Sequence, residues 1–335
     1  MPKITIRDVA LQAGVGTATV ERVINGRGNV REDTVQKVLA VVERLNYGIR
    51  PSKRHRPAIK IEVILVRPET SFFARLNQAF ERIAASLDRS VVLHRTFVKE
   101  SDPVGMAHHI ANPSFRRSGV IICALDHPKV TESLRRVREA GVEVVQVVSR
   151  CDDAEIPYVG IDNYAAGRSA GFFMSGMLGG RSGNLAAICH SGTYRTHRER
   201  IQGFSDFVAG KAGTHDLTRV MIGFDDDLRS ADLVSEALRH DPQIIGVYSA
   251  GGGDEGVATV LKTLSGQRDI FWVGHELTQR KKRYLQSGLL DICLDQAPET
   301  QARRSVDLIL RKLGIIQAEV AIDPVRFMTI TAQNV

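Results

Sequence analysis

Long apolar runs, paired cysteines and nucleotide-binding loops are all missing from this chain of 335 residues. No stretch of eighteen apolar residues occurs, which excludes a membrane-spanning helix. The chain starts on an amphipathic segment and not on an apolar signal core, which predicts a cytoplasmic protein. The four cysteines have no C-x-x-C spacing, so neither disulfides nor a zinc site are expected, and three of them lie in apolar strand-like runs as small core residues. They are Cys123, Cys151, Cys189 and Cys293.

Catalytic residue patterns are missing as well. We find no set of nucleophile, base and orienting residue, and the glycines at 251–253 lack both the Lys-Ser/Thr of a P-loop and the spacing of a dinucleotide site. These glycines are interpreted as a close backbone approach to a ligand, with Asp254 capping the next helix. His94, His108 and His109 have no metal-binding partners nearby in sequence and are interpreted as surface residues. No enzymatic activity, metal or cofactor is therefore expected.

Positive charge is concentrated in the N-terminal segment. Residues 1–60 contain 12 Lys and Arg against 5 Asp and Glu, whereas residues 61–335 contain 33 of each kind. The net charge of +7 therefore lies entirely on the first segment. A basic head joined to a neutral body is the electrostatic pattern of a nucleic-acid-binding domain tethered to a second domain.

The same segment has the pattern of three short helices. Residues 6–13 are apolar at helical spacing, and Gly14 is expected to end this helix in the left-handed conformation. Thr17 is expected to cap a second helix over 18–24, and an apolar stripe over 35–45 predicts a third. Two short helices joined by a tight turn that contains glycine predict a helix-turn-helix. A generic three-helix bundle with a charged outer face is the alternative.

A helix-turn-helix places the outward face of its second helix in the DNA major groove. Arg22 is suited to a bidentate contact with guanine, and Glu21 could accept from a cytosine amino group. Thr17, Thr19 and Asn25 could bind phosphates. The DNA-binding residues expected in this head are Thr17, Ala18, Thr19, Glu21, Arg22, Asn25 and Tyr47.

Beyond residue 59 the apolar pattern changes to short runs that are mostly separated by ten or more residues of helical character. Continuous apolar strands that alternate with helices predict parallel sheets covered on both faces and joined by right-handed crossovers. Nine strands are many for one sheet, so two similar halves are favoured. The runs are Ile61–Val66, Val91–Phe97, Val120–Ala124, Val142–Val148, Leu185–Cys189, Val220–Phe224, Ile244–Tyr248, Ile270–Val273 and Leu290–Leu294.

The N-terminal pattern I-x-D-V-A-x-x-A-G-V-x-x-x-T-V-x-R-V-I-N-G, at Ile6–Gly26, and the later Leu-Asn-Tyr, at Leu45–Tyr47, resemble the LacI/GalR family of transcriptional regulators. The resemblance extends over essentially the whole chain. It implies an α/β protein with an all-α helix-turn-helix head, followed by a two-lobed, periplasmic-binding-protein-like domain with parallel sheets. In that domain the chain crosses three times between the two lobes. The implied domains are 1–49 for the head, 50–58 for a basic hinge and 59–335 for the ligand and dimerisation domain, with lobe 1 at 59–161 and 298–323 and lobe 2 at 162–295 and 324–335.

The hinge departs from the family, which carries a short helix with a Leu that wedges into the minor groove. No Leu occurs between Gly48 and Pro57, and Pro57 would prevent a helix from continuing. Lys53, Arg54 and Arg56 suit a narrow minor groove or phosphates, so the hinge is expected to bind DNA electrostatically without a kinking wedge. A solvated basic linker is the alternative.

The resemblance also implies a ligand site, because open α/β sheets bind ligands beyond the carboxyl ends of their strands. The segment R-E-R-I-Q-G-F at 198–204 is similar to the family's ligand motif, in which Arg200 would fork onto sugar hydroxyls or other oxygens. Phe72 and Phe73 could stack on a sugar ring, although a core-facing pair is the alternative. Tyr194 and Thr196 flank the motif.

Further matches follow other strands. The Asp-Asn pair of the first crossover places Asn163 at the ligand and leaves Asp162 to cap a helix. Arg150 follows a strand where ribose-type proteins carry Asp-Arg, but Ser149 replaces the Asp and His275 replaces an aromatic residue. Ribose itself is therefore not expected. The expected ligand-binding residues are Phe72, Phe73, Arg150, Asn163, Tyr194, Thr196, Arg200, Glu276 and Gln296.

The resemblance implies a sequence-specific regulator, expected to be a repressor, that binds a pseudo-palindromic operator as a homodimer and responds to a sugar or polyol effector. A non-sugar ligand and an activator role remain as alternatives. A sugar-binding transport protein would need a signal peptide and no DNA head, and an enzyme on the two-lobed core would need a catalytic set, so both are less favoured.

Overall fold

The computed structural model describes residues 4–25, 30–45, 47, 58–211 and 215–335. The predicted hinge residues Lys53, Arg54 and Arg56 lie outside the described residues. The chain divides into two compact units, residues 1–60 with 86–92, and residues 61–85 with 93–335.

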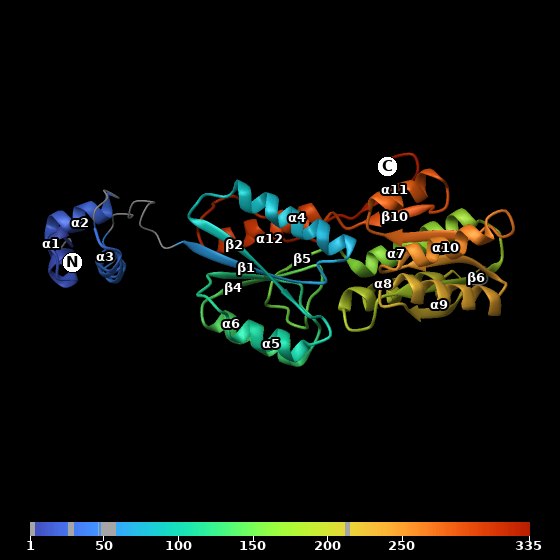
Figure 1. The fold of residues 1–335 in the computed structure, drawn as a ribbon, viewed down its shortest axis with the longest axis horizontal. Coiled ribbons are helices and arrows are strands. Elements are labelled where there is room, and N and C mark those ends of the chain that lie inside the picture. Colours follow the sequence, from blue (N-terminus) through green and yellow to red (C-terminus); the bar gives the residue numbers. More distant parts are fainter. Residues whose placement is uncertain (1–3, 26–29, 46, 48–57, 212–214) are drawn as a thin grey trace. The chain divides into compact units, whose positions relative to one another are not determined.

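The head consists of three helices, as the apolar spacing predicted (Figure 1). Each helix is too short to be stable alone, so packing of the apolar faces holds them together. The helices are α1 (Ile6–Ala13), α2 (Thr17–Ile24) and α3 (Glu32–Arg44). Their shared core contains Val9, Ala10, Val20, Val23, Ile24, Val35, Val38, Val41 and Val42.

The turn between α1 and α2 confirms one predicted cap and corrects another. Gly14 ends α1 with a φ of 67°, in the left-handed region that glycine enters most easily. The expectation that Thr17 caps α2 is wrong. Gly16 is the N-cap and its carbonyl accepts from Thr19 N at 2.9 Å, so Thr17 is the first helical residue.

The first lobe is a five-stranded sheet with the order β2-β1-β3-β4-β5. Helices α4 and α12 cover one face, and α5 and α6 cover the other (Figure 1). The strands are β1 (Ile59–Val66), β2 (Val91–Val98), β3 (Gly119–Ile122), β4 (Glu143–Val147) and β5 (Tyr158–Val159), and the helices are α4 (Ser71–Ser86), α5 (Pro103–Ala111), α6 (Pro128–Glu139) and α12 (Pro298–Lys312).

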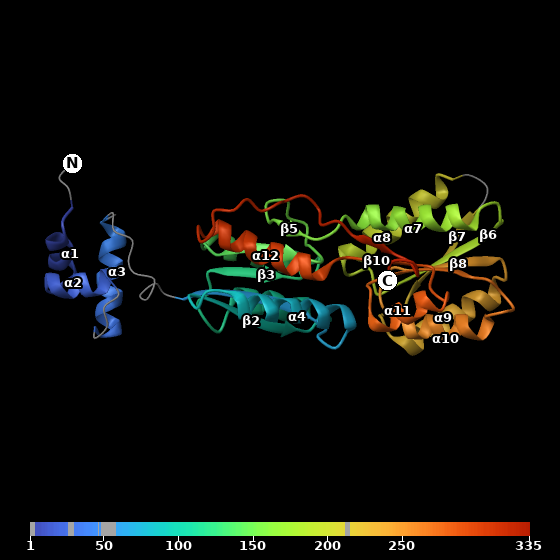
Figure 2. The same cartoon turned by 90° about the horizontal axis from the view of Figure 1, so that it is seen from above.

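The second lobe is a six-stranded sheet with the order β11-β10-β9-β8-β6-β7, whose described pairs are parallel except for β10–β11. Helices α7 and α8 lie on one face, with α9, α10 and α11 on the other (Figure 2). The strands are β6 (Gly183–Cys189), β7 (His215–Ile222), β8 (Ile244–Ser249), β9 (Phe271–His275), β10 (Ile292–Asp295) and β11 (Met328–Ile330), and the helices are α7 (Asn163–Leu178), α8 (Arg195–Ala209), α9 (Asp227–His240), α10 (Asp254–Leu264) and α11 (Gln279–Gln286).

Strand boundaries were predicted best where strands are buried on both sides. The edge strand β7 begins at His215 and ends at Ile222, not at Val220 and Phe224, because most of its side chains are exposed or half-buried and its first half forms no apolar run. Strand β5 was missed because it contains only two residues. All four cysteines are free and buried, Cys151 included, which was not among the three predicted as core residues.

Helices α7 and α8 approach each other closely through two glycines. A Cβ atom on Gly167 would lie 2.0 Å from the carbonyl oxygen of Arg200, and one on Gly203 would lie 2.1 Å from the carbonyl oxygen of Tyr164. Asp162 caps α7 by accepting from Ala165 N at 2.8 Å, as predicted. The backbone that carries Arg200 is thus held at a fixed distance from α7.

A buried ion pair lies inside the first lobe. Glu62 on β1 is 1% exposed and accepts hydrogen bonds from Thr96 Oγ1 at 2.7 Å and from Arg117 Nη1. His109 Nε2 lies 2.8 Å from Glu62 Oε1, so His109 is not the simple surface residue that was expected. Burial alone would raise the pKa of Glu62, but these three hydrogen bonds hold it below its ordinary value.

Within the described ranges, every helix is too short or too polar to cross a membrane. The same residues contain no group of three His, Cys, Asp or Glu arranged to hold a metal ion.

Candidate functional site: the interlobe cavity

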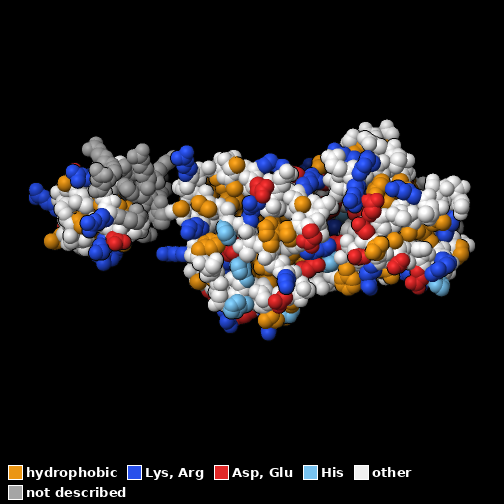
Figure 3. Space-filling view, viewed as in Figure 1, with side chains coloured by type: hydrophobic (Ala, Val, Ile, Leu, Met, Phe, Trp, Pro, Cys, Tyr) orange, Lys and Arg blue, Asp and Glu red, His pale blue; other side chains and the backbone are white. Residues whose placement is uncertain are grey.

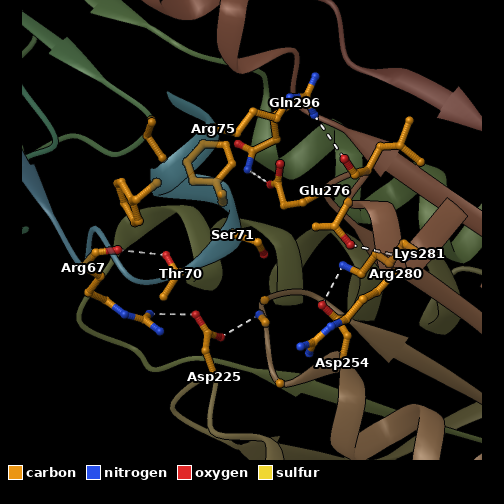
Figure 4. A pocket seen from close by; sticks show the side chains of 18 of the residues that line it. Arg67, Thr70, Ser71, Arg75, Asp225, Asp254, Glu276, Arg280, Lys281 and Gln296 are labelled. Carbon is orange, nitrogen blue, oxygen red and sulfur yellow. Dashed lines mark hydrogen bonds and ion pairs between the residues drawn. The ribbon is translucent and has the colours of Figure 1, made fainter. Parts of the chain in front are cut away.

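A cavity of about 1060 Å³ lies between the two lobes, lined by residues that follow the carboxyl ends of strands in both sheets. This is the position at which parallel α/β sheets bind ligands. The first turns of α4, α10 and α11 also contribute, among them Ser71, Asp254 and Arg280 (Figure 4). On the face drawn in Figure 3, acidic and basic side chains alternate along the junction of the lobes.

Unusual backbone conformations concentrate around this cavity. Non-glycine residues rarely adopt a positive φ, because the Cβ atom crowds the following carbonyl. Every described non-glycine residue with a positive φ follows a strand end at this junction. They are Arg67, Val148, Phe224, Asp225, Glu276 and Ala297, with φ between 48° and 67°. Such strain persists only where surrounding contacts hold it, and it is common at functional sites.

Arg200 on α8 is the central cation of the cavity. The side chain is 2% exposed, its Nε donates to Asn163 Oδ1 at 2.9 Å, and its Nη1 donates to the Ala250 carbonyl at 2.8 Å. Its Nη2 is buried without a hydrogen-bond partner and lies 4.0 Å from Glu276 Oε1. The guanidinium is thus fixed by two bonds and keeps one donor for a ligand.

Glu276 and Gln296 form an acceptor pair opposite this donor. Gln296 Nε2 donates to Glu276 Oε1, whereas Glu276 Oε2 and Gln296 Oε1 are buried without a described partner. Burial raises the pKa of Glu276 to about 7, although Arg200 opposes part of this rise. The pair extends from the ends of β9 and β10 (Figure 4).

Lys281 and Asp254 form a second buried ion pair beside Glu276. Lys281 is 1% exposed, and its Nζ lies 2.7 Å from Asp254 Oδ2 and donates to the His275 carbonyl. The expectation that Asp254 caps α10 is wrong. Gly253 is the N-cap, and the Asp254 side chain turns to Lys281, which leaves Asp254 Oδ1 without a partner. Burial raises the pKa of Asp254 to about 6 despite Lys281.

A charged cluster joins the two lobes at one end of the cavity. Arg67, which follows β1, donates to Asp225 Oδ2 at 2.7 Å and lies 3.4 Å from Glu100. Tyr194 OH donates to Glu100 Oε2 at 2.9 Å. Asp225 also accepts from Gly252 N at 2.6 Å, which places the predicted glycine segment against the cavity wall (Figure 4). These contacts join the two lobes across one end of the cavity.

The cavity also has an aromatic lining. Phe72 and Phe73 begin α4 with their ring centroids 5.2 Å apart, and both line the cavity, although Phe73 is buried. Phe224 lines the opposite lobe and is half exposed. Aromatic faces on two sides suit the apolar face of a sugar ring.

Most of the predicted ligand residues lie in the cavity, but two do not. Arg150 stacks over the Tyr158 ring at 5.0 Å and lies 3.3 Å from Glu199, outside the cavity lining. Asn163 is buried outside the lining and instead orients Arg200. Val148 has a left-handed φ, and the residues of this segment that line the cavity are Val148 and Ser149, not Arg150.

Tyr194 and Thr196 line the cavity, but the hydroxyl groups of both side chains already form hydrogen bonds to residues of the first lobe. Thr196 Oγ1 donates to the Val148 carbonyl at 2.9 Å, while Tyr194 donates to Glu100.

The sequence analysis missed the cavity residues Arg67, Arg75, Phe224, Asp225 and Lys281. Arg67, Phe224 and Asp225 each follow a strand end, which is a positional signal that could have identified them.

Two family models match the chain. The model described as bacterial regulatory proteins, lacI family, matches residues 5–49, and the periplasmic binding protein domain matches residues 61–314. The chain therefore has a lacI-family regulatory domain at its N-terminus and belongs, over residues 61–314, to the periplasmic binding protein domain family.

Curated relatives of this chain include two bacterial proteins named catabolite control protein A. Catabolite control protein A of Streptococcus mutans is 29% identical over 171 residues, which is 50% of each chain. The protein of the same name from Priestia megaterium is 28% identical over 207 residues, which is 60% of each chain. The matches thus span about half to three fifths of the length of these relatives.

Solved structures resemble the two-lobed domain. An ABC transporter solute-binding protein from Burkholderia graminis, in complex with D-arabinose, has a TM-score of 0.74 at 20% identity, covering 83% of this chain and 96% of that chain. A glucose-galactose binding protein from Geobacillus stearothermophilus has a TM-score of 0.72 at 18% identity, covering 83% and 99%. At these identities the likeness shows the fold alone.

The lacI-family head exposes the second helix of its motif. Thr17, Ala18, Glu21, Arg22 and Asn25 are exposed, and Thr19 is half-buried. Tyr47 packs against the apolar core of the head. The opposite face of α2 supplies Val20, Val23 and Ile24 to that core, so the polar face remains available for a contact.

Proposed function

We propose that this protein is a DNA-binding transcription regulator, acting as a repressor, whose operator affinity depends on a hydroxyl-rich effector bound in the interlobe cavity. The observation that carries the proposal is the pairing of a lacI-family head, with Arg22 exposed on α2, and a cavity with unpartnered buried polar atoms. One curated relative is named HTH-type transcriptional regulator pepR1 and two others catabolite control protein A, which supports a regulatory role in place of an enzymatic one. Binding to chromosomal DNA would place the protein in the cytoplasm.

The effector would act by stabilising the closed arrangement of the lobes. Arg200 and Glu276 extend from the second lobe, while Phe72 and Phe73 extend from the first, so a ligand that touches both sets favours closure. Coupling is reciprocal, so a ligand that weakens DNA binding is itself bound more weakly by the DNA complex.

Two heads would read two half-sites. A twofold protein dimer requires an operator with matching pseudo-palindromic symmetry, because each head presents the same face to its half-site. We therefore propose a homodimer that binds such an operator through the exposed residues of α2 and, outside the described residues, through Lys53, Arg54 and Arg56 of the hinge.

Selection of bound duplexes from a random DNA pool tests the DNA-binding function. We expect the enriched sequences to be pseudo-palindromic, and we expect Arg22→Ala to weaken binding to the selected operator about 5- to 150-fold, because one bidentate base contact contributes about 1–3 kcal/mol. Fluorescence anisotropy at fixed salt measures the affinities.

Arg303→Ala is the matched control, because Arg303 is an exposed arginine on α12 that pairs with Asp307 and lies outside the head. This variant should bind the operator as the unchanged protein does. Enrichment of no sequence, or equal losses in the two variants, would contradict the proposal.

A further inference from the structure

The charges that line the cavity have an acidic excess. Eight described lining residues are Asp or Glu and six are Lys or Arg. His197 does not offset this excess, because burial lowers its pKa to about 3 and keeps the imidazole neutral. A ligand that enters the cavity therefore meets a negative field when the carboxyl groups are ionised.

Four of the six lining cations are already engaged with carboxylates of the protein, whereas no ion pair is described for the half-buried Lys282. Lys281 pairs with Asp254, Arg75 lies 2.5 Å from Asp295, and Arg280 lies 3.1 Å from Glu255. Arg67 pairs with Asp225 in the interlobe cluster. Among the buried guanidinium nitrogens of the described lining, Arg200 Nη2 alone has no hydrogen-bond partner, and Glu276 already lies 4.0 Å away.

Among the buried cavity atoms that lack a hydrogen-bond partner, acceptors outnumber obligate donors, so the acceptors require donors on the ligand. Asp254 Oδ1, Glu276 Oε2 and Gln296 Oε1 line the cavity without partners, and each oxygen accepts only, apart from a protonated carboxyl group. The hydrogen bond from Gln296 Nε2 to Glu276 fixes which end of the amide is the oxygen. Against these three acceptors stand one obligate donor, Arg200 Nη2, and two atoms that can donate or accept, Ser149 Oγ and His197 Nδ1.

Classes of ligand differ in how many hydrogen bonds they can form with these unpartnered cavity atoms. A hydroxyl group both donates and accepts, and an ammonium group donates, so a polyol or an amino-substituted polyol can satisfy the acceptors and still accept from Arg200. An ionised phosphate or carboxylate on the ligand offers acceptors only. It would also approach Glu276 and Asp254 as a like charge in a buried site, which is strongly unfavourable.

We infer that the effector is a donor-rich hydroxyl compound without negative charge, and that the cavity rejects sugar phosphates and sugar acids. This inference rests on the proposed function and narrows its effector class. Glu276 and Asp254 are the residues that select against anions, and Arg200 alone is too closely balanced by Glu276 to hold one.

Matched series of ligands test this selection. Each series contains a neutral pentose or hexose, its phosphate, its sugar acid and its amino sugar, titrated by calorimetry into the full-length protein at pH 8 and constant ionic strength. We expect the neutral member of the binding series to bind at least 100-fold more tightly than its phosphate and its acid. A second arm uses the Glu276→Gln, Asp254→Asn double variant, in which this ratio should fall at least tenfold.

The outcomes separate the two proposals. An anionic member that binds as tightly as its neutral parent would overturn the inference and leave the regulatory function standing. An unchanged ratio in the double variant would also overturn it, since selection would then lie elsewhere. If no neutral or anionic member binds, both the proposed polyol effector and the inferred rejection of anions are overturned. The DNA-binding function would still be tested separately, by the enrichment of operators from the random DNA pool.

Discussion

Replacement of Arg200 by methionine is expected to weaken effector binding by about 30-fold to several thousand-fold, because removing one partner of a buried, hydrogen-bonded charge costs about 2–5 kcal/mol. Methionine keeps much of the side-chain volume but removes the free Nη2 donor. It also leaves Glu276 without its nearest cation, so the raised pKa of Glu276 should rise further. The measurement is calorimetric titration with the neutral sugar that raises the melting temperature most.

Arg168→Met provides the matched control for this variant. Arg168 is an exposed arginine on the neighbouring helix α7, where it stacks over the Phe207 ring at 5.5 Å outside the cavity lining. The control should bind the effector within about twofold of the unchanged protein, since surface substitutions usually change free energies by about 0.5 kcal/mol or less. A folded Arg200→Met protein with the same affinity would contradict the assignment of Arg200 to the ligand.

Loss of Arg117 is expected to reduce the free energy of unfolding by about 3–5 kcal/mol, because Arg117→Met leaves the carboxylate of Glu62 buried without its countercharge. Glu62 is 1% exposed and Arg117 is 5% exposed, so neither group reaches solvent easily. The hydrogen bonds from Thr96 and His109 remain but supply no permanent charge. Urea unfolding of the two proteins at pH 8 measures the difference.

The pH dependence of this loss has a definite sign. In the unchanged protein the pKa of Glu62 lies below its ordinary 4.5, so its stabilising contribution is present above that pH and is lost as the pH falls through the lowered pKa. Without Arg117, only the hydrogen bonds from Thr96 and His109 oppose burial, so we expect the pKa of Glu62 to rise and stability to be lost as the pH rises through it. The destabilisation should therefore be smaller at pH 5 than at pH 8.

Two further variants make the Arg117 prediction specific. The Glu62→Leu, Arg117→Met double variant removes both charges and should recover most of the lost stability. Arg116→Met changes the exposed neighbouring arginine and should shift the unfolding free energy by about 0.5 kcal/mol or less. Equal losses for Arg116→Met and Arg117→Met, or a double variant no more stable than the single one, would show that the buried pair is not the cause.

The sequence predicted the elements whose signal is local. The apolar faces of the head helices and the continuous runs of β1, β3, β4 and β8 follow directly from residue spacing, and the structure contains them. Strand β5 was missed because it is two residues long, and strand β7 was predicted with wrong bounds because most of its side chains are exposed or half-buried.

The candidate site was predictable only in part, because its chemistry depends on pairings between distant segments. Arg200 was found from its motif, but its partners Asn163 and Ala250 come from two other elements. Lys281 follows the start of α11 and meets Asp254 only after the second lobe has folded. No spacing in the sequence indicates that pair, and the same holds for Arg67 with Asp225 across the lobes.

The acidic character of the cavity likewise appears only in three dimensions. The residues after position 60 carry equal numbers of acidic and basic side chains. Folding gathers carboxyl groups from the starts of helices and the ends of strands around one cavity, and burial raises the pKa of two of them, Asp254 and Glu276. Selection by ligand charge is therefore a property of the fold and not of the composition.

The most direct test of this account is the affinity of the full-length protein for its selected operator, measured with and without a saturating neutral effector. We expect the effector to change operator affinity about 5- to 150-fold, which corresponds to a coupling free energy of about 1–3 kcal/mol. The same addition should leave operator binding by Arg200→Met unchanged at that concentration. An effector that binds the unchanged protein tightly and yet leaves its operator affinity unaltered would contradict the central claim that the cavity controls the head.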